Sequence, residues 1–282
     1  MSGSGWRASL RRLPFHLVVA LIVVYALTPF IWALSTSFKT EDDLFGAARL
    51  FPREPTTKNY AYVLGDAGFM SSLGNSVIVA GGSSLTALTA GSLAAYALGR
   101  LRFRGKTPML YAVLAMTMFP QISILSGLYL TVRELNIYGT QAAMLFAYPL
   151  FTLPFSTWVL TSFFRGLPRE IEEAAIVDGA TTAQILARIL LPLTVPALVT
   201  TGLLTFIVSW NEYLLARSFT VTNPSAQTVP VAMAQFAGIV EQQEPIAEIM
   251  AAAMIVTLPL VVLVLVFQQR IAAGLTAGSV KG

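Results

Sequence analysis

Six long apolar runs alternate with shorter polar segments along the chain. They lie at residues 13–35, 73–98, 108–132, 141–164, 193–216 and 248–268, and most of their interiors contain no charged residue. About 20 apolar residues in a helix cross a hydrocarbon core that is roughly 30 Å thick. The pattern therefore predicts an all-α polytopic membrane protein with six transmembrane helices.

The segments between the runs set the expected organisation. Residues 1–12 are expected to form a cytoplasmic N-terminal segment, and residues 13–282 a single transmembrane domain that ends in a tail over 269–282. Residues 38–72, 165–192 and 219–247 are too long to be simple turns. Long loops on a helical bundle are places where partners or gates usually lie.

The second apolar run is rich in small residues. Such residues let helix backbones approach closely, so this helix is expected to be a packed, interior one. Simple helix packing and a place beside a pore explain the pattern equally well. The small residues are Gly81, Gly82, Ser83, Ser84, Ala87, Ala90, Gly91, Ala94 and Ala95.

The cationic residues are divided unevenly between the two sides. If the N-terminus is cytoplasmic, twelve of the 18 Lys and Arg residues fall inside and six outside, four of the six in the loop 38–72. The positive-inside rule then predicts that both termini lie in the cytoplasm. The first run is too long for the apolar region of a cleaved signal peptide, so we interpret it as an uncleaved first span.

The composition narrows the chemistry. Hydrophobic residues make up 55% of the chain and charged residues 11%, and the mean hydropathy is +0.70. Because there is no cysteine and a single histidine, His16, disulfides, thiol nucleophiles and a His or Cys metal site are excluded. The net charge of +4 lies mostly in short connecting segments, which favours topogenic charge over binding to nucleic acid.

The cytoplasmic loop 165–192 contains signals for two helices separated by a bend. Pro168 suits a first helical position, and acidic residues follow where the helix dipole favours them. Gly179 suits the left-handed position that ends a helix, and Thr181 with Gln184 has capping-box spacing for the next helix.

This predicted helix pair has a surface with few side-chain atoms. Ala174, Ala175 and Gly179 are expected to form it, and such a surface can enter a groove on another protein. A rigid element joined to two spans can tilt them when its partner moves. The loop is therefore a candidate coupling element.

The same residues carry a resemblance to a known family. The series Glu173, Ala174, Ala175, Asp178, Gly179 and Ala180, followed by Ile189, Leu191 and Pro192, resembles the conserved "EAA" loop of ABC importer permeases. The resemblance implies a type I permease fold in the cytoplasmic membrane of a bacterium. It also implies, as partners, a second homologous permease, two ATPase subunits that hold ATP and Mg, and an extracytoplasmic sugar-binding protein.

The C-terminus extends this resemblance. Residues 267–270 and 274–282 are similar to the tail of permeases for maltose, trehalose and related oligosaccharides, which implies that Thr276 and Lys281 contact the ATPase subunits. A solvated end is the alternative. Because similarity to the trehalose-type permeases of actinobacteria covers nearly the whole chain, trehalose is the expected sugar. In that family the loop near 235–245 probes the binding protein.

The ATPase is not expected in this chain. A phosphate-binding loop follows a buried strand with the spacing G-x-x-x-x-G-K-[ST]. The nearest sequence runs from Gly99 to Gly105, Lys106 and Thr107, has five intervening residues, and lies at the end of an apolar run. We therefore expect a non-catalytic subunit without a cofactor of its own.

A path for a neutral sugar requires hydrogen-bonding and aromatic side chains. For Glu212, an ionisable group in a span, packing between helices is the alternative to a role in the path. An importer of another solute such as glycerol phosphate, an ion-coupled carrier and an intramembrane hydrolase are the competing functions. The candidates for the path are Asn75, Gln121, Tyr148, Trp158, Trp210, Asn211 and Glu212.

Overall fold

A computed structural model describes residues 4–46, 49–236 and 245–277, with side chains described for 14–46, 49–235 and 245–269. Within these ranges every secondary-structure element is helical, which confirms the predicted fold class. The chain divides into two compact units, Met1–Asp66 with Gln235–Thr257 and Ala67–Ala234 with Leu258–Gly282. The single transmembrane domain over residues 13–282 stays a prediction.

The first unit contains α1 (Ser4–Ser37), α2 (Glu41–Phe45), α3 (Lys58–Gly65) and the beginning of α15 (Ile246–Ala277). The amide of Asn59 on α3 donates to the carbonyl oxygens of Ser37 and Lys39, each at 2.9 Å, and so joins α3 to the end of α1. Side chains such as Leu21 and Tyr25 on α1 are exposed, as is usual for a helix that faces lipid.

The second unit contains most of the helices and the beginning of α14. They are α4 (Ala67–Gly99), α5 (Lys106–Met116), α6 (Gln121–Glu134), α7 (Gln141–Ala147), α8 (Pro149–Gly166), α9 (Glu170–Val177), α10 (Thr182–Gln184), the π-helix η1 (Ile185–Leu190), α11 (Leu191–Leu193), α12 (Val195–Trp210), α13 (Leu214–Thr220), the 3-10 helix η2 (Pro224–Ala226) and α14 (Val229–Phe236).

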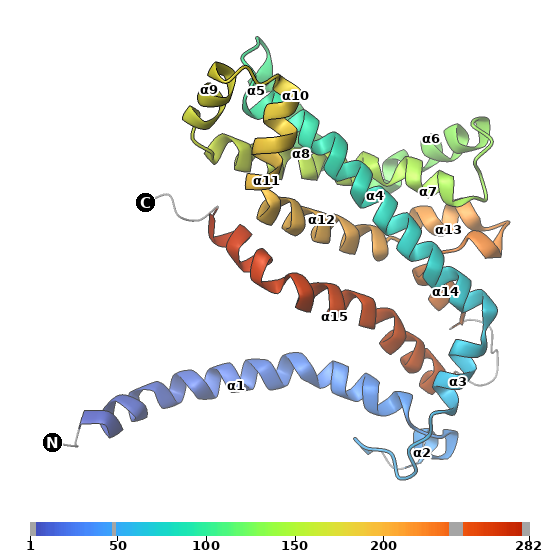
Figure 1. Cartoon of the computed structure of the whole chain (residues 1–282). Coiled ribbons are helices and arrows are strands. Elements are labelled where there is room, and N and C mark those ends of the chain that lie inside the picture. The colour runs from blue at the N-terminus through green and yellow to red at the C-terminus, as the bar shows by residue number, and fades with distance from the viewer. Residues whose placement is uncertain (1–3, 47–48, 237–244, 278–282) are drawn as a thin grey trace. The chain divides into compact units, whose positions relative to one another are not determined.

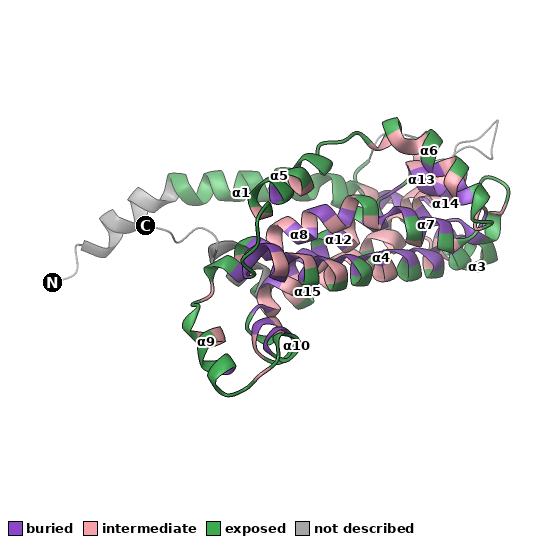
Figure 2. Ribbon diagram, turned by 90° about the horizontal axis from the view of Figure 1, so that it is seen from above, coloured by how far each residue is buried: buried purple, intermediate pink, exposed green. Residues whose placement is uncertain are grey.

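Helix α4 forms the centre of this unit and runs beside α8 and α12 (Figure 1). Small residues permit this contact. A Cβ atom at Gly91 would lie 3.0 Å from Cβ of Ser156 on α8, and one at Gly202 would lie 2.8 Å from Cδ1 of Leu88. The prediction of a packed, interior second helix is therefore confirmed. Buried residues follow the facing sides of these helices, whereas α9 is mostly exposed (Figure 2).

The described residues contain four continuous helical stretches that are long and apolar enough to cross a membrane, and two bent pairs. The stretches are Pro14–Ser37, Ala67–Gly99, Gln141–Gly166 and Ile246–Gln269. Counting each bent pair as one span gives the six that the sequence predicts. The span boundaries themselves stay predictions.

The third expected span, 108–132, is not one continuous helix. Helices α5 and α6 meet at 92° across the segment from Thr117 to Pro120. Pro120 has no N–H to donate, has an extended backbone, and disfavours helical geometry at Phe119. The chain therefore bends before α6 begins at Gln121.

The fifth expected span, 193–216, also differs. It begins with a 79° bend at Thr194, and α12 ends at Trp210 instead of continuing to residue 216. Pro196 cannot donate to the carbonyl oxygen of Pro192, so the helix is interrupted at this point. Asn211 is the C-terminal cap of α12, and a separate helix, α13, follows.

Candidate functional site

Helix α9 ends in the bend that the sequence predicts. The φ of Gly179 is +81°, the N–H of Gly179 donates to the carbonyl of Ile176 at 3.0 Å, and the N–H of Ala180 donates to the carbonyl of Ala175 at 2.9 Å. These two bonds form a Schellman motif, in which a glycine supplies the left-handed residue. The prediction for Gly179 is confirmed.

The next helix begins with the predicted capping box. The Thr181 N–H donates to Oε1 of Gln184 at 2.8 Å, and the Gln184 N–H donates to Oγ1 of Thr181 at 3.3 Å. Helix α9 itself begins at Glu170, two residues after Pro168. Both sides of the bend are therefore fixed by local hydrogen bonds, which makes α9, the bend and α10 a stiff unit.

The outer surface of this element differs from the expected one. Ala175 is only 7% exposed because its methyl group packs with Tyr96, Ile185 and Leu186 inside the unit. It cannot belong to an outer contact surface, and that expectation is wrong. The exposed apolar side chains are instead Ile176 (62%) and Val177 (87%). Glu173, Ala174, Asp178 and Gly179 are exposed, and Ala180 is half-buried.

Arg100, one residue after the end of α4, joins α4 to α9. Its Nε lies 3.1 Å from Oε1 of Glu172, and the two side chains are 3% and 16% exposed. Its Nη2 also donates to the carbonyl oxygen of Pro168 at 3.2 Å. We call these contacts the Arg100 clasp. The contacts join α9 to the end of α4. Because the pair is largely withdrawn from water, removing one partner would leave the other as an uncompensated buried charge.

Two further cations meet the C-terminal end of α4. Arg165 donates to the carbonyl oxygen of Leu98 at 3.3 Å, and Nζ of Lys106 donates to those of Gly99 and Leu101 at 3.0 and 3.1 Å. Cations are favourable at this end of a helix dipole. The sequence from Gly99 to Lys106 thus follows a helix and caps it, unlike a phosphate-binding loop.

A cleft of about 660 Å³ lies between α9 and the end of α4. Arg100, Arg102 and Arg169 line it together with Glu172 and Glu173. Because both cationic and anionic side chains line the cleft, this face can form ion pairs with groups of either charge on a partner.

Several expected path residues are instead used to hold the fold together. The Asn75 amide is 6% exposed and donates to the carbonyl oxygens of Ser225 and Gln227, each at 2.8 Å, while Gln141 donates to its Oδ1. Ser76 accepts from the N–H of Val229 at 2.8 Å. These contacts attach the connection after α13 to α4, so Asn75 has no free donor for a sugar.

The carboxylate of Glu212 also has hydrogen-bond partners on the backbone. It accepts from the N–H groups of Leu215 at 2.8 Å and Ala216 at 3.0 Å, at the beginning of α13, and the side chain is 8% exposed. The buried hydroxyl of Tyr148 lies beside this carboxylate. Packing, the alternative considered for Glu212, matches this geometry.

The other path candidates are scattered. Trp210 is 1% exposed and stacks on Phe206, with ring centroids 5.5 Å apart. Asn211 is exposed and donates to the carbonyl of Ile207, whereas Gln121 and Trp158 are half-buried. The structure therefore does not bring the candidates together as one site. In the tail, Lys281 and the side chain of Thr276 lie outside the described residues, as does most of the loop near 235–245.

Residues 87–277 match the family described as binding-protein-dependent transport system inner membrane component. The chain belongs to this family. The match includes α8, the loop at residues 165–192, α12 and α15, so the loop that suggested the family lies at its centre. The chain is thus a non-catalytic permease component of the inner membrane.

Named relatives cover nearly the whole chain. The trehalose/maltose transport system permease protein MalG of Thermococcus litoralis is 42% identical, over 97% of this chain and 98% of its own. The trehalose permease SugB of Mycobacterium tuberculosis is 40% identical, over 93% and 95%. The sulfoquinovosyl glycerol permease SmoH of Agrobacterium fabrum is 36% identical, over 95% and 94%.

A solved structure shows the same fold. The chain is similar to one from a bacterial ABC transporter that imports the acidic polysaccharide alginate, with a TM-score of 0.81, 21% identity and coverage of 95% and 99%. At this identity the likeness shows the type I importer fold alone. The expected fold class is confirmed.

One residue that contacts the candidate coupling element could not be found from the sequence. By its position, Arg100 looks like a loop charge that sets topology. The pair Arg100 and Glu172 is 72 residues apart in sequence, so no local spacing indicates that the two side chains meet.

Proposed function

We propose that this chain is one of two permease subunits of an ATP-driven importer for a di- or oligosaccharide, with trehalose as the first sugar to test. The observation that carries the proposal is the stiff, exposed element around α9, fixed to α4 by the Arg100 clasp, in a chain of this family. The trehalose permeases among the relatives support the choice of sugar.

In this mechanism the partner ATPase subunits bind ATP and Mg and move α9. The Schellman bend and the capping box keep α9 and α10 from yielding, so the displacement reaches the spans. Glu172 and Arg100 pass part of it to α4, while the direct chain connections pass it to α8 and α12. The outer connections face a sugar-loaded binding protein, and both termini lie in the cytoplasm.

Val177 is the most informative position for a test of docking. It is 87% exposed in this chain, and burying a valine in a partner groove contributes about 1.5–3 kcal/mol. Val177→Asp should reduce copurification of the ATPase subunits and stimulation of ATP hydrolysis by the loaded binding protein. Val221→Asp, at a 52% exposed valine after α13 and outside the α9 element, is the matched control and should keep copurification of the ATPase subunits.

The substrate is tested with the complete transporter reconstituted in vesicles. Uptake of labelled trehalose is measured with competition by maltose, sulfoquinovosyl glycerol and glycerol phosphate. ATP-dependent uptake of trehalose is expected. Uptake that survives without ATP and is abolished by an uncoupler would favour an ion-coupled carrier, and normal docking by Val177→Asp would remove the coupling role from α9.

A further inference from the structure

Threonine hydroxyls and phenylalanine rings meet in one cleft of the second unit. The cleft is about 230 Å³ in volume, and no charged residue lines it. Thr152 and Thr205 are 3% and 1% exposed, so both belong to the packed structure and not to a mobile surface. Its lining consists of Thr117, Phe151, Thr152, Phe155, Thr205 and Val208.

The three hydroxyl groups are arranged as acceptors. Each donates its hydrogen to a carbonyl oxygen of its own helix: Thr117 to Leu114 at 2.7 Å, Thr152 to Tyr148 at 3.2 Å, and Thr205 to Gly202 at 2.9 Å. A hydroxyl oxygen whose hydrogen is already used still has a lone pair that can accept. The cleft therefore offers hydrogen-bond acceptors beside aromatic faces, which suits a neutral polyol ring.

The three lining helices place this cleft at a similar depth. Lys106, Gly166 and Val195 mark the ends of α5, α8 and α12 nearest the coupling loop. With a rise of 1.5 Å per residue, Thr117 lies roughly 16 Å, Thr205 roughly 15 Å and Thr152 roughly 21 Å along its helix from that end. These distances are equal to or above the roughly 15 Å of half a hydrocarbon core, so the cleft lies well inside the candidate spans and away from their ends.

The break between α5 and α6 begins at the same place. Thr117 is the C-terminal cap of α5, directly before the 92° bend. Irregular backbone at membrane depth is tolerated only where protein buries it or where it lines a cavity, and broken helices commonly form substrate sites.

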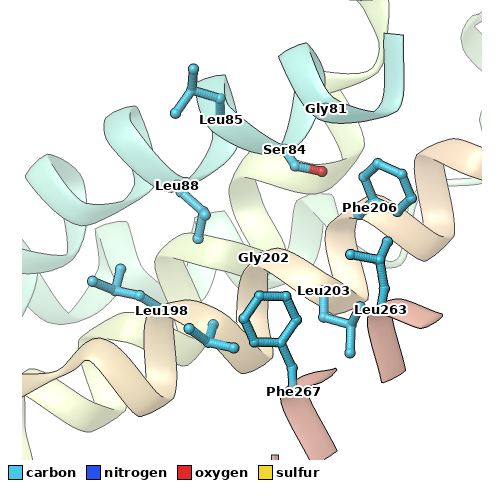
Figure 3. A pocket seen from close by; sticks show the side chains of 11 residues that line it. Gly81, Ser84, Leu85, Leu88, Leu198, Gly202, Leu203, Phe206, Leu263 and Phe267 are labelled. Carbon is cyan, nitrogen blue, oxygen red and sulfur yellow. The ribbon is translucent and has the colours of Figure 1, made fainter. Parts of the chain in front are cut away.

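A second cavity of this unit serves as a contrast. The groove of about 380 Å³ between α4, α12 and α15 is lined by leucine, valine and phenylalanine side chains, and Ser84 supplies the single side-chain oxygen (Figure 3). Such a groove has almost nothing with which a sugar hydroxyl could form a hydrogen bond.

We propose that the cleft between Thr117, Thr152 and Thr205 is a subsite of the translocation path that holds one pyranose ring of the passing sugar. This inference rests on the proposed function. Its volume is smaller than the roughly 300–1,000 Å³ of sites for drug-sized ligands, so the cleft takes one ring at a time. The Thr oxygens accept from sugar hydroxyls, and Phe151 and Phe155 contact the apolar ring face.

The test uses the complete transporter in vesicles and compares Thr152→Val/Thr205→Val with wild type. The variant keeps the side-chain shape and loses both acceptors, so the number of trehalose molecules moved per ATP hydrolysed should fall on the order of tenfold. Thr86→Val on α4 is the matched control, because its hydroxyl also donates to a carbonyl four residues earlier but lies outside the cleft. It should leave transport unchanged.

A second measurement does not depend on rates of transport. The chain has no cysteine, so Val208→Cys at a 52% exposed position introduces one thiol beside the cleft, and Val77→Cys at a 51% exposed position on α4 is its control. During turnover, trehalose should slow labelling of the first thiol several-fold relative to turnover without sugar, and leave the second unaffected.

The outcomes separate the two proposals. If the wild-type transporter shows no ATP-dependent uptake of trehalose, maltose or sulfoquinovosyl glycerol, the proposed function fails and the subsite fails with it. If wild type transports trehalose but the double variant moves as much sugar per ATP as Thr86→Val does, the subsite alone is overturned. Equal labelling of the Val208→Cys thiol with and without sugar would likewise overturn the subsite and leave the proposed function standing.

Discussion

Removing the guanidinium of Arg100 is the sharpest perturbation of the link between α4 and α9. Arg100→Met keeps most of the apolar stem but leaves Glu172 without its cation and the Pro168 carbonyl without its donor. Glu172→Gln removes the opposite charge, and the double variant completes a thermodynamic cycle. The cycle measures the coupling between the two side chains rather than the cost of either change.

The expected magnitude follows from the geometry. At 3.1 Å and an effective dielectric constant of about 20, the gross attraction between the two charges is about 5 kcal/mol. Desolvation of the guanidinium, which is only 3% exposed, offsets part of this, while Glu172 at 16% exposure keeps some hydration. We therefore expect a coupling free energy of about 2–3 kcal/mol, which corresponds to roughly 30–150-fold in an equilibrium constant.

Two assays on the complete transporter measure this. The apparent thermal midpoint should fall for each single variant and fall less than additively for the double variant. The stimulation of ATP hydrolysis by the loaded binding protein should weaken in Arg100→Met. It should be partly kept in Arg100→Lys, which keeps the positive charge but loses the planar guanidinium that can donate to two acceptors at once. Additive effects, together with wild-type stimulation in Arg100→Met, would refute the role of the clasp.

Three other substitutions test separate parts of the structure. Gly179→Ala should lower the apparent stability of the transporter by about 1–2 kcal/mol and weaken coupling, because alanine disfavours the positive φ of this residue. Gly179→Asn should cost less, since asparagine tolerates that φ better. A Cβ at this position meets nothing within 4 Å, so equal losses of stability in the two variants would contradict backbone conformation as the cause. Asn75→Leu should increase hydrogen exchange at residues 225–229 and lower the stability of the transporter by about 2–3 kcal/mol. Asn211→Leu is the control and should leave exchange there unchanged. Unchanged exchange in Asn75→Leu would show that the Asn75 amide does not anchor this segment. Glu212→Gln should destabilise α13 by about 1–2 kcal/mol, measured as faster hydrogen exchange of the Leu215 and Ala216 amides, and should preserve transport. A tenfold loss of transport with unchanged exchange would instead support a role for Glu212 in the sugar path.

In the loop at residues 165–192, local sequence signals predicted the features that depend on neighbouring residues. Gly179 takes a positive φ because the end of α9 needs one, and Thr181 caps α10 because its partner Gln184 is three residues away. The expectation for Ala175 was wrong because helical spacing alone does not say which face a neighbouring segment covers. In this chain η1 and the end of α4 cover it.

The bends and the polar anchors were harder to predict. Apolar content marked the region of the third span, but hydropathy averages over a window and does not register one proline, Pro120, that divides α5 from α6. Asn75 and Glu212 looked like path residues because a polar group in a span is costly. The tertiary structure removes that cost by giving them backbone partners.

By itself, the sequence determined the all-helical membrane class, the family and the bend that follows α9. These depend on composition and on contacts between residues within a few positions of each other. Only the tertiary structure decided that Arg100 meets Glu172, that Asn75 binds residues 150 or more positions away, and that Thr117, Thr152 and Thr205 share one cleft. Those contacts depend on how the helices pack, because α4, α8 and α12 bring distant segments together where small residues let their backbones approach.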